Sequence, residues 1–180
     1  MELKNLPNAI EAYNSALKVN KKDYRAWYGL GQAYELQNQL HFAIYYFQQT
    51  LLSNPKDSRM WNAIGTCFEK MECRDEAEKC YHRGEALDDH EGISLFQLGK
   101  MYDLMGKVNK AVACFEGNLG RKREGGVLDK ETGETLLFLA YYYKGQGEVD
   151  KALELANQLM AFSGIEREEG QNLIHLLNNK

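Results

Sequence analysis

The stretch W-Y-G-L-G-Q-A-Y, from Trp27 to Tyr34, decides how the rest of the chain is interpreted. Its two glycines, Gly29 and Gly31, stand on either side of a leucine. Such a pair can begin a phosphate-binding loop, or it can mark a place where two helices come close. A dinucleotide-binding fingerprint needs a third glycine and a preceding strand, and this stretch offers neither. The stretch is therefore better explained by helix packing, provided that its residues recur.

They do recur, with a period of 34 residues: Trp27 is followed by Trp61 and then by Leu95. The other positions move in step, as Leu30-Gly31, Ile64-Gly65 and Leu98-Gly99; as Ala43, Ala77 and Ala111; and as Phe47, Tyr81 and Phe115. This is the tetratricopeptide (TPR) pattern W-x2-L-G-x2-Y…A-x3-F…P, whose units each form two antiparallel helices. The sequence therefore predicts an all-α fold, a right-handed α-solenoid of helix-turn-helix repeats.

The register of the repeat predicts the boundaries of each unit. With Trp27 at the fourth position, complete repeats are expected at 24–57, 58–91, 92–125 and, after an insertion loop at 126–132, at 133–166. The whole segment from Gly120 to Thr132 is glycine-rich and charged, and an extended loop is predicted there. Residues 1–23 should hold the second helix of a truncated repeat, and 167–180 a C-terminal capping helix. We therefore expect the chain to be a fragment or a truncated gene model, with more repeats upstream.

The composition argues against two classes of partner. The formal net charge of −4 argues against a nucleic-acid partner, since such modules are usually basic. The longest apolar run, Leu136 to Tyr143, is far shorter than the roughly 20 residues that span a membrane. The N-terminus has no apolar core of signal-peptide length. We expect neither nucleic acid nor membrane as a partner, and a location in the nucleus and cytoplasm.

No residue pattern predicts chemistry. The cysteines lack paired C-x-x-C spacing and are expected to be reduced thiols; they are Cys67, Cys73, Cys80 and Cys114. The histidines show neither an i, i+4 pair nor an H-E-x-x-H motif. We predict no catalytic residues, no metal site, no cofactor and no small-molecule substrate. The run Arg121-Lys122-Arg123 could be a nucleic-acid or import patch, but solvated charges in a loop are the preferred interpretation.

The first helices of tandem TPR repeats line a concave face, and positions 2, 5, 9 and 12 of each repeat usually point into it. These positions hold Arg25, Tyr28, Gln32 and Glu35; then Arg59, Asn62, Thr66 and Glu69; then Ile93, Phe96, Lys100 and Asp103. Position 12 is acidic three times, which suits a basic peptide side chain. Position 2 is arginine twice, and arginine can hold a carboxylate bidentately. We predict a peptide-binding groove; the alternative is a solvated face with ordinary charges.

Tyr28 and Phe96 add apolar or stacking surface to this predicted groove. Chaperone-binding TPR proteins clamp a C-terminal carboxylate with Lys at position 5 and Asn at position 9. In the first repeat, Tyr28 and Gln32 stand there instead. That difference counts against the chaperone-binding specialisation.

Several longer stretches carry a more specific resemblance: V-N-K-K-D-Y-R-A-W-Y-G-L-G-Q-A-Y-E (Val19–Glu35), N-P-K-D-S-R-M (Asn54–Met60), E-A-E-K-C-Y (Glu76–Tyr81) and R-E-E-G-Q-N-L-I-H-L-L (Arg167–Leu177). They resemble the C-terminal part of TPR subunits of the anaphase-promoting complex, or cyclosome, of the cell-division-cycle twenty-three (subunit eight) family. The insertion falls where that family has an interrupted repeat. The resemblance extends over nearly the whole chain.

This resemblance implies a non-catalytic scaffold in a multi-subunit cell-cycle E3 ubiquitin ligase. The implied partners are the neighbouring subunits and the C box of the coactivators, a short basic-aromatic motif. Homodimerisation in the family uses N-terminal repeats, so no dimer is expected here. The alternatives are a TPR adaptor or co-chaperone of another complex, and the repeat arm of an enzyme.

Overall fold

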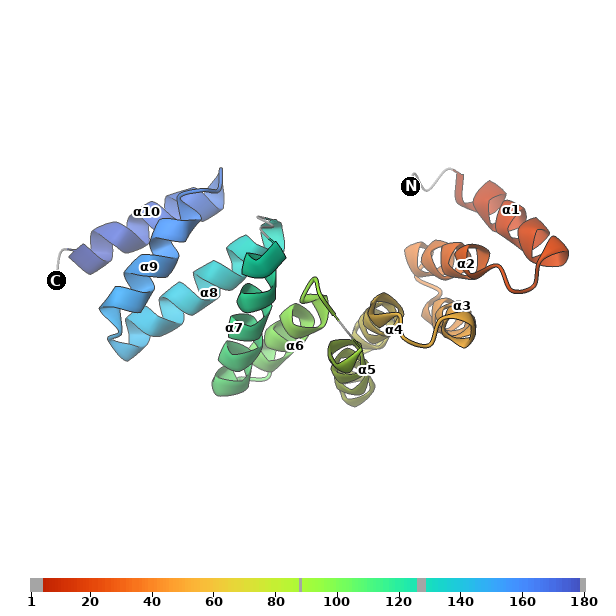
Figure 1. Ribbon diagram of the computed structural model, residues 1–180, viewed down its shortest axis with the longest axis horizontal. Coiled ribbons are helices and arrows are strands. Elements are labelled where there is room, and N and C mark those ends of the chain that lie inside the picture. The colour runs from red at the N-terminus through yellow and green to blue at the C-terminus, as the bar shows by residue number, and fades with distance from the viewer. Residues whose placement is uncertain (1–4, 88, 126–128, 179–180) are drawn as a thin grey trace. The chain divides into compact units, whose positions relative to one another are not determined.

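The computed structural model describes residues 5–87, 89–125 and 129–178, and these residues form ten α-helices (Figure 1). The chain divides into two compact units, Met1–Asp89 and His90–Lys180. The predicted all-α TPR fold is confirmed.

The first unit contains five helices: α1 (Leu6–Val19), α2 (Tyr24–Leu36), α3 (Leu40–Ser53), α4 (Ser58–Lys70) and α5 (Arg74–Ala86). The helix pairs α2/α3 and α4/α5 lie within the predicted repeats 24–57 and 58–91. The starts of α2 and α4 are set by Asp23 and Asp57, whose carboxylates accept backbone N–H groups of the first turn. The first turn of α1 contains a proline, where a missing N–H costs nothing.

The second unit contains α6 (Ile93–Leu104), α7 (Val108–Gly125), α8 (Lys130–Gln146), α9 (Val149–Leu159) and α10 (Ile165–Asn178). Helix α10 packs against α9 and α8, as expected of a helix that covers the last repeat. Gly170 of α10 comes so close to α9 that an added Cβ would lie 2.8 Å from Cβ of Leu159.

The glycines of the Trp27–Tyr34 stretch lie inside α2, not in a phosphate-binding loop. A Cβ on Gly31 would lie 2.5 Å from ring carbons of Phe47 on α3, and a Cβ on Gly29 would lie 2.3 Å from the ring of Tyr13 on α1. The first contact recurs in the next two repeats, where Gly65 faces Tyr81 and Gly99 faces Phe115. Each glycine therefore makes room for an aromatic ring on a neighbouring helix.

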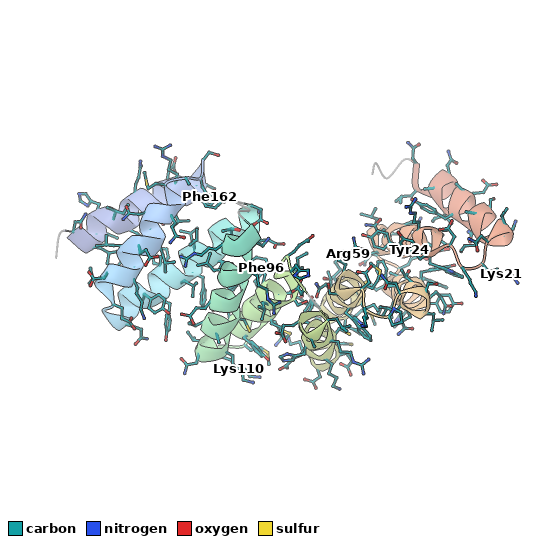
Figure 2. All side chains as sticks on the ribbon, in the orientation of Figure 1. Lys21, Tyr24, Arg59, Phe96, Lys110 and Phe162 are labelled. Atoms are coloured by element: carbon teal, nitrogen blue, oxygen red, sulfur yellow. The ribbon has the colours of Figure 1, made fainter. Side chains whose placement is uncertain are left out.

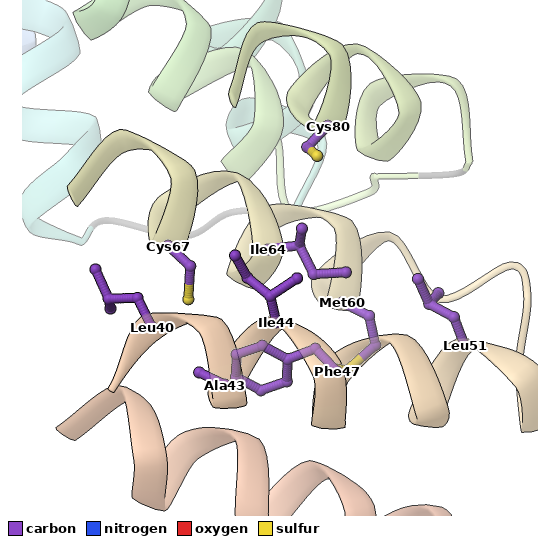
Figure 3. Packing of buried hydrophobic residues seen from close by; sticks show 9 residues of the cluster. All are labelled: Leu40, Ala43, Ile44, Phe47, Leu51, Met60, Ile64, Cys67 and Cys80. Atoms are coloured by element: carbon purple, nitrogen blue, oxygen red, sulfur yellow. The ribbon is translucent and has the colours of Figure 1, made fainter. Parts of the chain in front are cut away.

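A buried cluster joins successive repeats in the first unit (Figure 3). Met60, Ile64 and Cys67 of α4 pack with apolar residues of α3. Those of α3 are Leu40, Ala43, Ile44, Phe47 and Leu51. The apolar positions lie three and four residues apart, so each helix presents one buried stripe.

The turn inside each helix pair has the same geometry in all four pairs. One residue per turn has a positive φ: Asn38 at 58°, Glu72 at 61°, Gly106 at 69° and Gly147 at 79°. Around the first of these, the Asn38 N–H bonds the Glu35 carbonyl and the Gln39 N–H bonds the Tyr34 carbonyl, which is the Schellman arrangement. The repeat thus places a residue with left-handed backbone conformation at one fixed position, whether or not that residue is glycine.

The predicted extended loop between Gly120 and Thr132 is wrong for most of its length. Helix α7 continues to Gly125 and α8 begins at Lys130, while residues 126–128 of the predicted insertion lie outside the described residues. Each helix is longer than its counterparts in the first unit, with 18 and 17 residues against 13 or 14.

One of the charged residues in this helical segment, Lys122, is a buried lysine. The Lys122 side chain is only 6% exposed, so it is not one of the solvated loop charges that the sequence suggested. Its ammonium bonds the carboxylate of Asp129 and, at 3.3 Å, that of Glu131. Burial opposes ionisation of Asp129, but hydrogen bonds from Lys122 and Thr132 outweigh it and lower the pKa of the carboxyl group. The ion pair therefore ties the extension of α7 to the start of α8.

Candidate functional site

The predicted groove residues of the first unit come from α2 and α4, and an ion pair joins these two helices. Nζ of Lys70 on α4 lies 2.7 Å from Oε1 of Glu35 on α2. The two side chains are 45% and 22% exposed, so the pair is partly screened by solvent. We call the surface formed by Tyr28, Gln32, Glu35, Thr66, Glu69 and Lys70 the α2/α4 face.

Glu69, the second acidic residue of this face, is held by a tyrosine of the neighbouring helix α5. The hydroxyl of Tyr81 on α5 donates to Oε2 of Glu69 at 2.8 Å. The same hydroxyl lies 3.4 Å from that of Thr66. Burial raises the pKa of the Tyr81 phenol, so it stays protonated and acts as a donor. Glu69 is therefore kept in one orientation on the face.

An open pocket of about 480 Å³ lies beside the Glu35–Lys70 pair and is lined by Gln32, Glu35, Leu36, Asn38 and Lys70. Next to it, Nε2 of Gln32 donates to the Tyr28 hydroxyl at 2.7 Å. This part of the face combines an aromatic ring, an amide and a carboxylate. Such a surface can receive a peptide that carries both a cation and an apolar side chain.

The two arginines at position 2 are engaged locally. Arg59 does hold a carboxylate bidentately, but the carboxylate is that of Asp57 at the start of its own helix, at 3.0 and 2.9 Å. Figure 2 labels Arg59 and also Tyr24, whose hydroxyl lies 3.5 Å from Nε of Arg25. To bind a partner's carboxylate, Arg59 would thus have to release the carboxylate of Asp57.

Position 5 turns inward in two of the three repeats, which corrects the expectation that it lines the groove. Asn62 is 5% exposed and Phe96 is 3% exposed. Phe96 is buried because it packs against the aromatic residue of the second helix: the Phe96 and Phe115 ring centroids are 6.1 Å apart. Tyr28 lies at the same distance from Phe47, but it remains partly exposed.

The second unit carries the remaining predicted groove residues on α6. Nζ of Lys100 lies 5.3 Å from the centroid of the Phe96 ring, and Asp103 is exposed near the end of the helix. Ile93 is half-buried at the start of the helix. Of the three predicted acidic residues, Glu35 and Glu69 therefore belong to the first unit and Asp103 to the second.

Sequence reasoning missed the side chains that hold these acids. Lys70 follows Glu69 directly, but it bonds Glu35 of the preceding repeat. Tyr81 was assigned only to packing, although its hydroxyl reaches the face. The sequence contained a signal for the Glu35–Lys70 pair. An acid at position 12 of one repeat lies close to a lysine at position 13 of the next repeat wherever the first helices stack side by side.

Three features of the described part of the chain bear on chemistry and on membrane insertion: metal-ligating side chains, apolar helices and cysteine thiols. The described residues include no group of three or more metal-ligating side chains, and none of their helices is long and apolar enough to cross a membrane. Burial raises the pKa of the Cys67 thiol to about 12, with the nearby Glu35 carboxylate acting in the same direction. That thiol is therefore packed and unreactive rather than nucleophilic.

Relatives with known names share part of the sequence. The chain is 39% identical over 106 residues to anaphase-promoting complex subunit 8 of Arabidopsis thaliana and 36% identical over 105 residues to subunit 8 of Dictyostelium discoideum. These alignments span 59% and 58% of this chain, but only 18% of each relative. Subunit 3 of the same complex from Schizosaccharomyces pombe is 30% identical over 105 residues, 58% of this chain and 16% of that protein. The resemblance to the TPR subunits of this complex is confirmed.

Two further comparisons bear on the fold. The crystal structure of MamA superposes with a TM-score of 0.67 at 18% identity, covering 98% of this chain and 93% of that one, which shows a shared fold. A general TPR repeat model matches residues 1–38. A longer match, over residues 27–162, is to the model described as the cilia and flagella-associated protein 70 middle TPR-like domain. The chain belongs to this family of TPR-like domains.

Proposed function

We propose that this chain is the TPR part of an anaphase-promoting complex subunit of the subunit-eight kind, acting as a non-catalytic scaffold in the nucleus and cytoplasm. The observation that carries the proposal is the similarity to subunit 8 of a plant and of an amoeba. The alignments span less than a fifth of those relatives, so the proposal concerns only that part of them. Stacked repeats offer extended surfaces for neighbouring subunits.

Peptide docking by the α2/α4 face is the finer part of the proposal. Glu35 and Glu69 each use one oxygen to bond a neighbour, Lys70 or Tyr81, and are thereby held in place. Their charge suits the basic residues of a coactivator C-box-like motif, and the partly exposed ring of Tyr28 suits its apolar residue. Because these side chains are already oriented, binding would cost little ordering entropy.

Co-purification tests the scaffold proposal. The chain carrying an affinity tag is expressed in cells of its source organism, and the captured proteins are identified by mass spectrometry. We expect other anaphase-promoting complex subunits to be recovered. Recovery of chaperones without any of those subunits would overturn the proposal and favour a co-chaperone.

A further inference from the structure

A second surface of the first unit has the features of a binding site, and it does not involve the α2/α4 face. A pocket of about 600 Å³ opens between α1 and α3, lined by Asn14, Leu17, Lys18, Lys21, Trp27, Tyr45 and Tyr46. We call it the α1/α3 pocket. Its volume lies within the range of about 300–1,000 Å³ that is usual for ligand sites.

The apolar side of the α1/α3 pocket is a set of ordered aromatic rings. The Trp27 and Tyr46 centroids are 5.8 Å apart, and Tyr46 stacks on Tyr34 at 5.1 Å with an interplanar angle of 4°. Tyr45 meets Tyr46 edge-on at 5.2 Å and is itself 50% exposed. An exposed ring fixed by its neighbours provides contact area at a low entropic cost.

These aromatic rings are not required by the repeat. At the positions 34 residues later, Trp27 and Leu17 are matched by Trp61 and Leu51, but Tyr45 and Tyr46 are replaced by Lys79 and Cys80. One repeat further on, the same two positions hold Ala113 and Cys114. A TPR helix pair therefore folds without this aromatic pair, and the half-exposed ring of Tyr45 offers apolar surface to a partner.

The lysines of the α1/α3 pocket are equally specific to it. The positions 34 residues after Lys18 and Lys21 hold Leu52 and Pro55. Lys21 lies in the connection between α1 and α2, where Figure 2 labels it, and its carbonyl accepts a hydrogen bond of 2.9 Å from Nε1 of Trp27. That bond holds the basic rim next to the aromatic floor.

Two other surfaces of the chain differ in charge and covering from the α1/α3 pocket. Trp61, the counterpart of Trp27, is covered by the guanidinium of Arg83, 4.8 Å from its ring. The pocket beside α7 and α9 in the second unit contains both signs of charge, and its Arg123 lies 3.5 Å from Glu154 and 3.1 Å from Gln158. Among the described residues that line the α1/α3 pocket, by contrast, none is acidic.

We propose that the α1/α3 pocket binds an acidic peptide segment of a partner protein, with one large apolar side chain inserted against Trp27 and Tyr45 and flanking carboxylates bonded to Lys18 and Lys21. Lys18 and Lys21 form a local positive rim on a chain whose net charge is −4, and this rim complements the carboxylates of an acidic peptide. A peptide is favoured over nucleic acid, because only two cations line the pocket and nucleic-acid binding normally neutralises several phosphates.

Titration of a short fluorescein-labelled peptide, in which aspartates and glutamates flank one central phenylalanine, tests this proposal by fluorescence anisotropy. The Lys18→Glu/Lys21→Glu variant should bind about tenfold more weakly or worse, and so should Tyr45→Ala, which copies the third repeat without adding a charge. The charge-matched control Lys56→Glu/Lys79→Glu changes two exposed lysines of the same unit outside the pocket and should leave the dissociation constant unchanged. Peptides with a central alanine, or with lysines in place of the acids, should lose binding.

The indole N–H resonances locate the bound peptide. On titration, the resonance of Trp27 should shift while that of Trp61 stays in place, with the assignment made from Trp61→Phe. Equal weakening by the control variant, a shift confined to Trp61, or no binding of the acidic peptide would overturn the proposal. Tighter binding of a labelled single-stranded RNA than of the peptide would also overturn it. A failure here leaves the co-purification result unaffected, since that result does not depend on this pocket.

Discussion

The helix pairs α2/α3 and α8/α9 meet the same packing requirement with different residues. In α2/α3, Gly31 has no side chain and Phe47 fills the space above it. In α8/α9 the corresponding residues are Ala140 and Ala156, and both are fully buried. One pair combines a very small residue with a large one, and the other combines two small residues. The repeat therefore fixes the combined space that the two side chains fill between the helices, and not the residue type at each position.

The largest expected effect comes from giving α2/α3 the residues of α8/α9. Phe47→Ala should destabilise the first unit by about 4 kcal/mol, because it removes a fully buried ring. Gly31→Ala alone should cost about 2 kcal/mol through its clash with that ring. The double variant should cost about 2 kcal/mol less than the two single costs together, because the clash disappears with the ring.

Hydrogen exchange at amides of α2 and α3 measures these costs, since neighbouring repeats can unfold separately. Gly145→Ala serves as the control, since nothing lies within 4 Å of an added Cβ there. Simple additivity of Gly31→Ala and Phe47→Ala would contradict the shared-space account.

A second comparison concerns the connections between successive helix pairs. In the first unit, α3 and α4 are connected by a short turn, and Asp57 caps the start of α4. In the second unit, α7 and α8 are longer helices, and Lys122 of α7 bonds Asp129 at the start of α8. Lys122→Met should destabilise the second unit by about 2 kcal/mol, a value below that of fully buried pairs because the acids are about one-third exposed. The exposed Lys130→Met should cost almost nothing. Urea denaturation of both variants, followed by circular dichroism, makes the comparison.

Acid should reveal the same ion pair. The folded-state pKa of Asp129 is lowered, so its contribution to stability is fully present above its unfolded pKa of about 4 and is lost as the pH falls through the lower folded value. The difference in unfolding free energy between wild type and Lys122→Met should therefore shrink below pH 4. A difference that stays constant from pH 7 to pH 2 would assign the role of Lys122 to packing alone.

The smallest expected effect on stability concerns the positive-φ residue in the turn inside each helix pair. Glu72 has a φ of 61° where Gly147 has 79°, and only glycine adopts this conformation without strain. Glu72→Gly should stabilise the first unit by up to about 1 kcal/mol, and Gly147→Ala should destabilise the second by about 1 kcal/mol. Thermal unfolding of the two variants checks both signs. Destabilisation by Glu72→Gly would show that the side chain of Glu72 contributes more than its backbone strain costs.

The sequence predicted the helix pairs that recur with the repeat, but it did not predict the helical segment around Lys122, which lacks the apolar pattern of the repeat. Trp27, Gly31 and Phe47 revealed the helix pairs because each position recurs with a common packing role. The extension around Lys122 was taken for a loop, since glycines and charges lack the apolar periodicity by which helices are recognised. Lys122 in this helical segment pairs with Asp129 at the start of α8, a contact that local sequence preference does not encode.

The candidate site was predicted in part for a similar reason. The repeat alone predicts that Glu35 and Glu69 reach the surface, and both are partly exposed. It does not predict that Asn62 and Phe96 pack inward. The contacts that orient the acids come from neighbouring helices. Lys70 reaches Glu35 from the next repeat, and this depends on how the repeats stack.

The central claim is that the α2/α4 face binds a basic peptide through its two oriented carboxylates. Glu35→Gln/Glu69→Gln keeps side-chain oxygens that can accept from Lys70 and Tyr81, and removes only the charge. Glu11→Gln/Glu72→Gln is the charge-matched control, with both residues exposed and outside this face. Titration of a C-box-like peptide should give a dissociation constant about tenfold higher for the first variant and an unchanged one for the control. Equal affinities for wild type and both variants would contradict the claim.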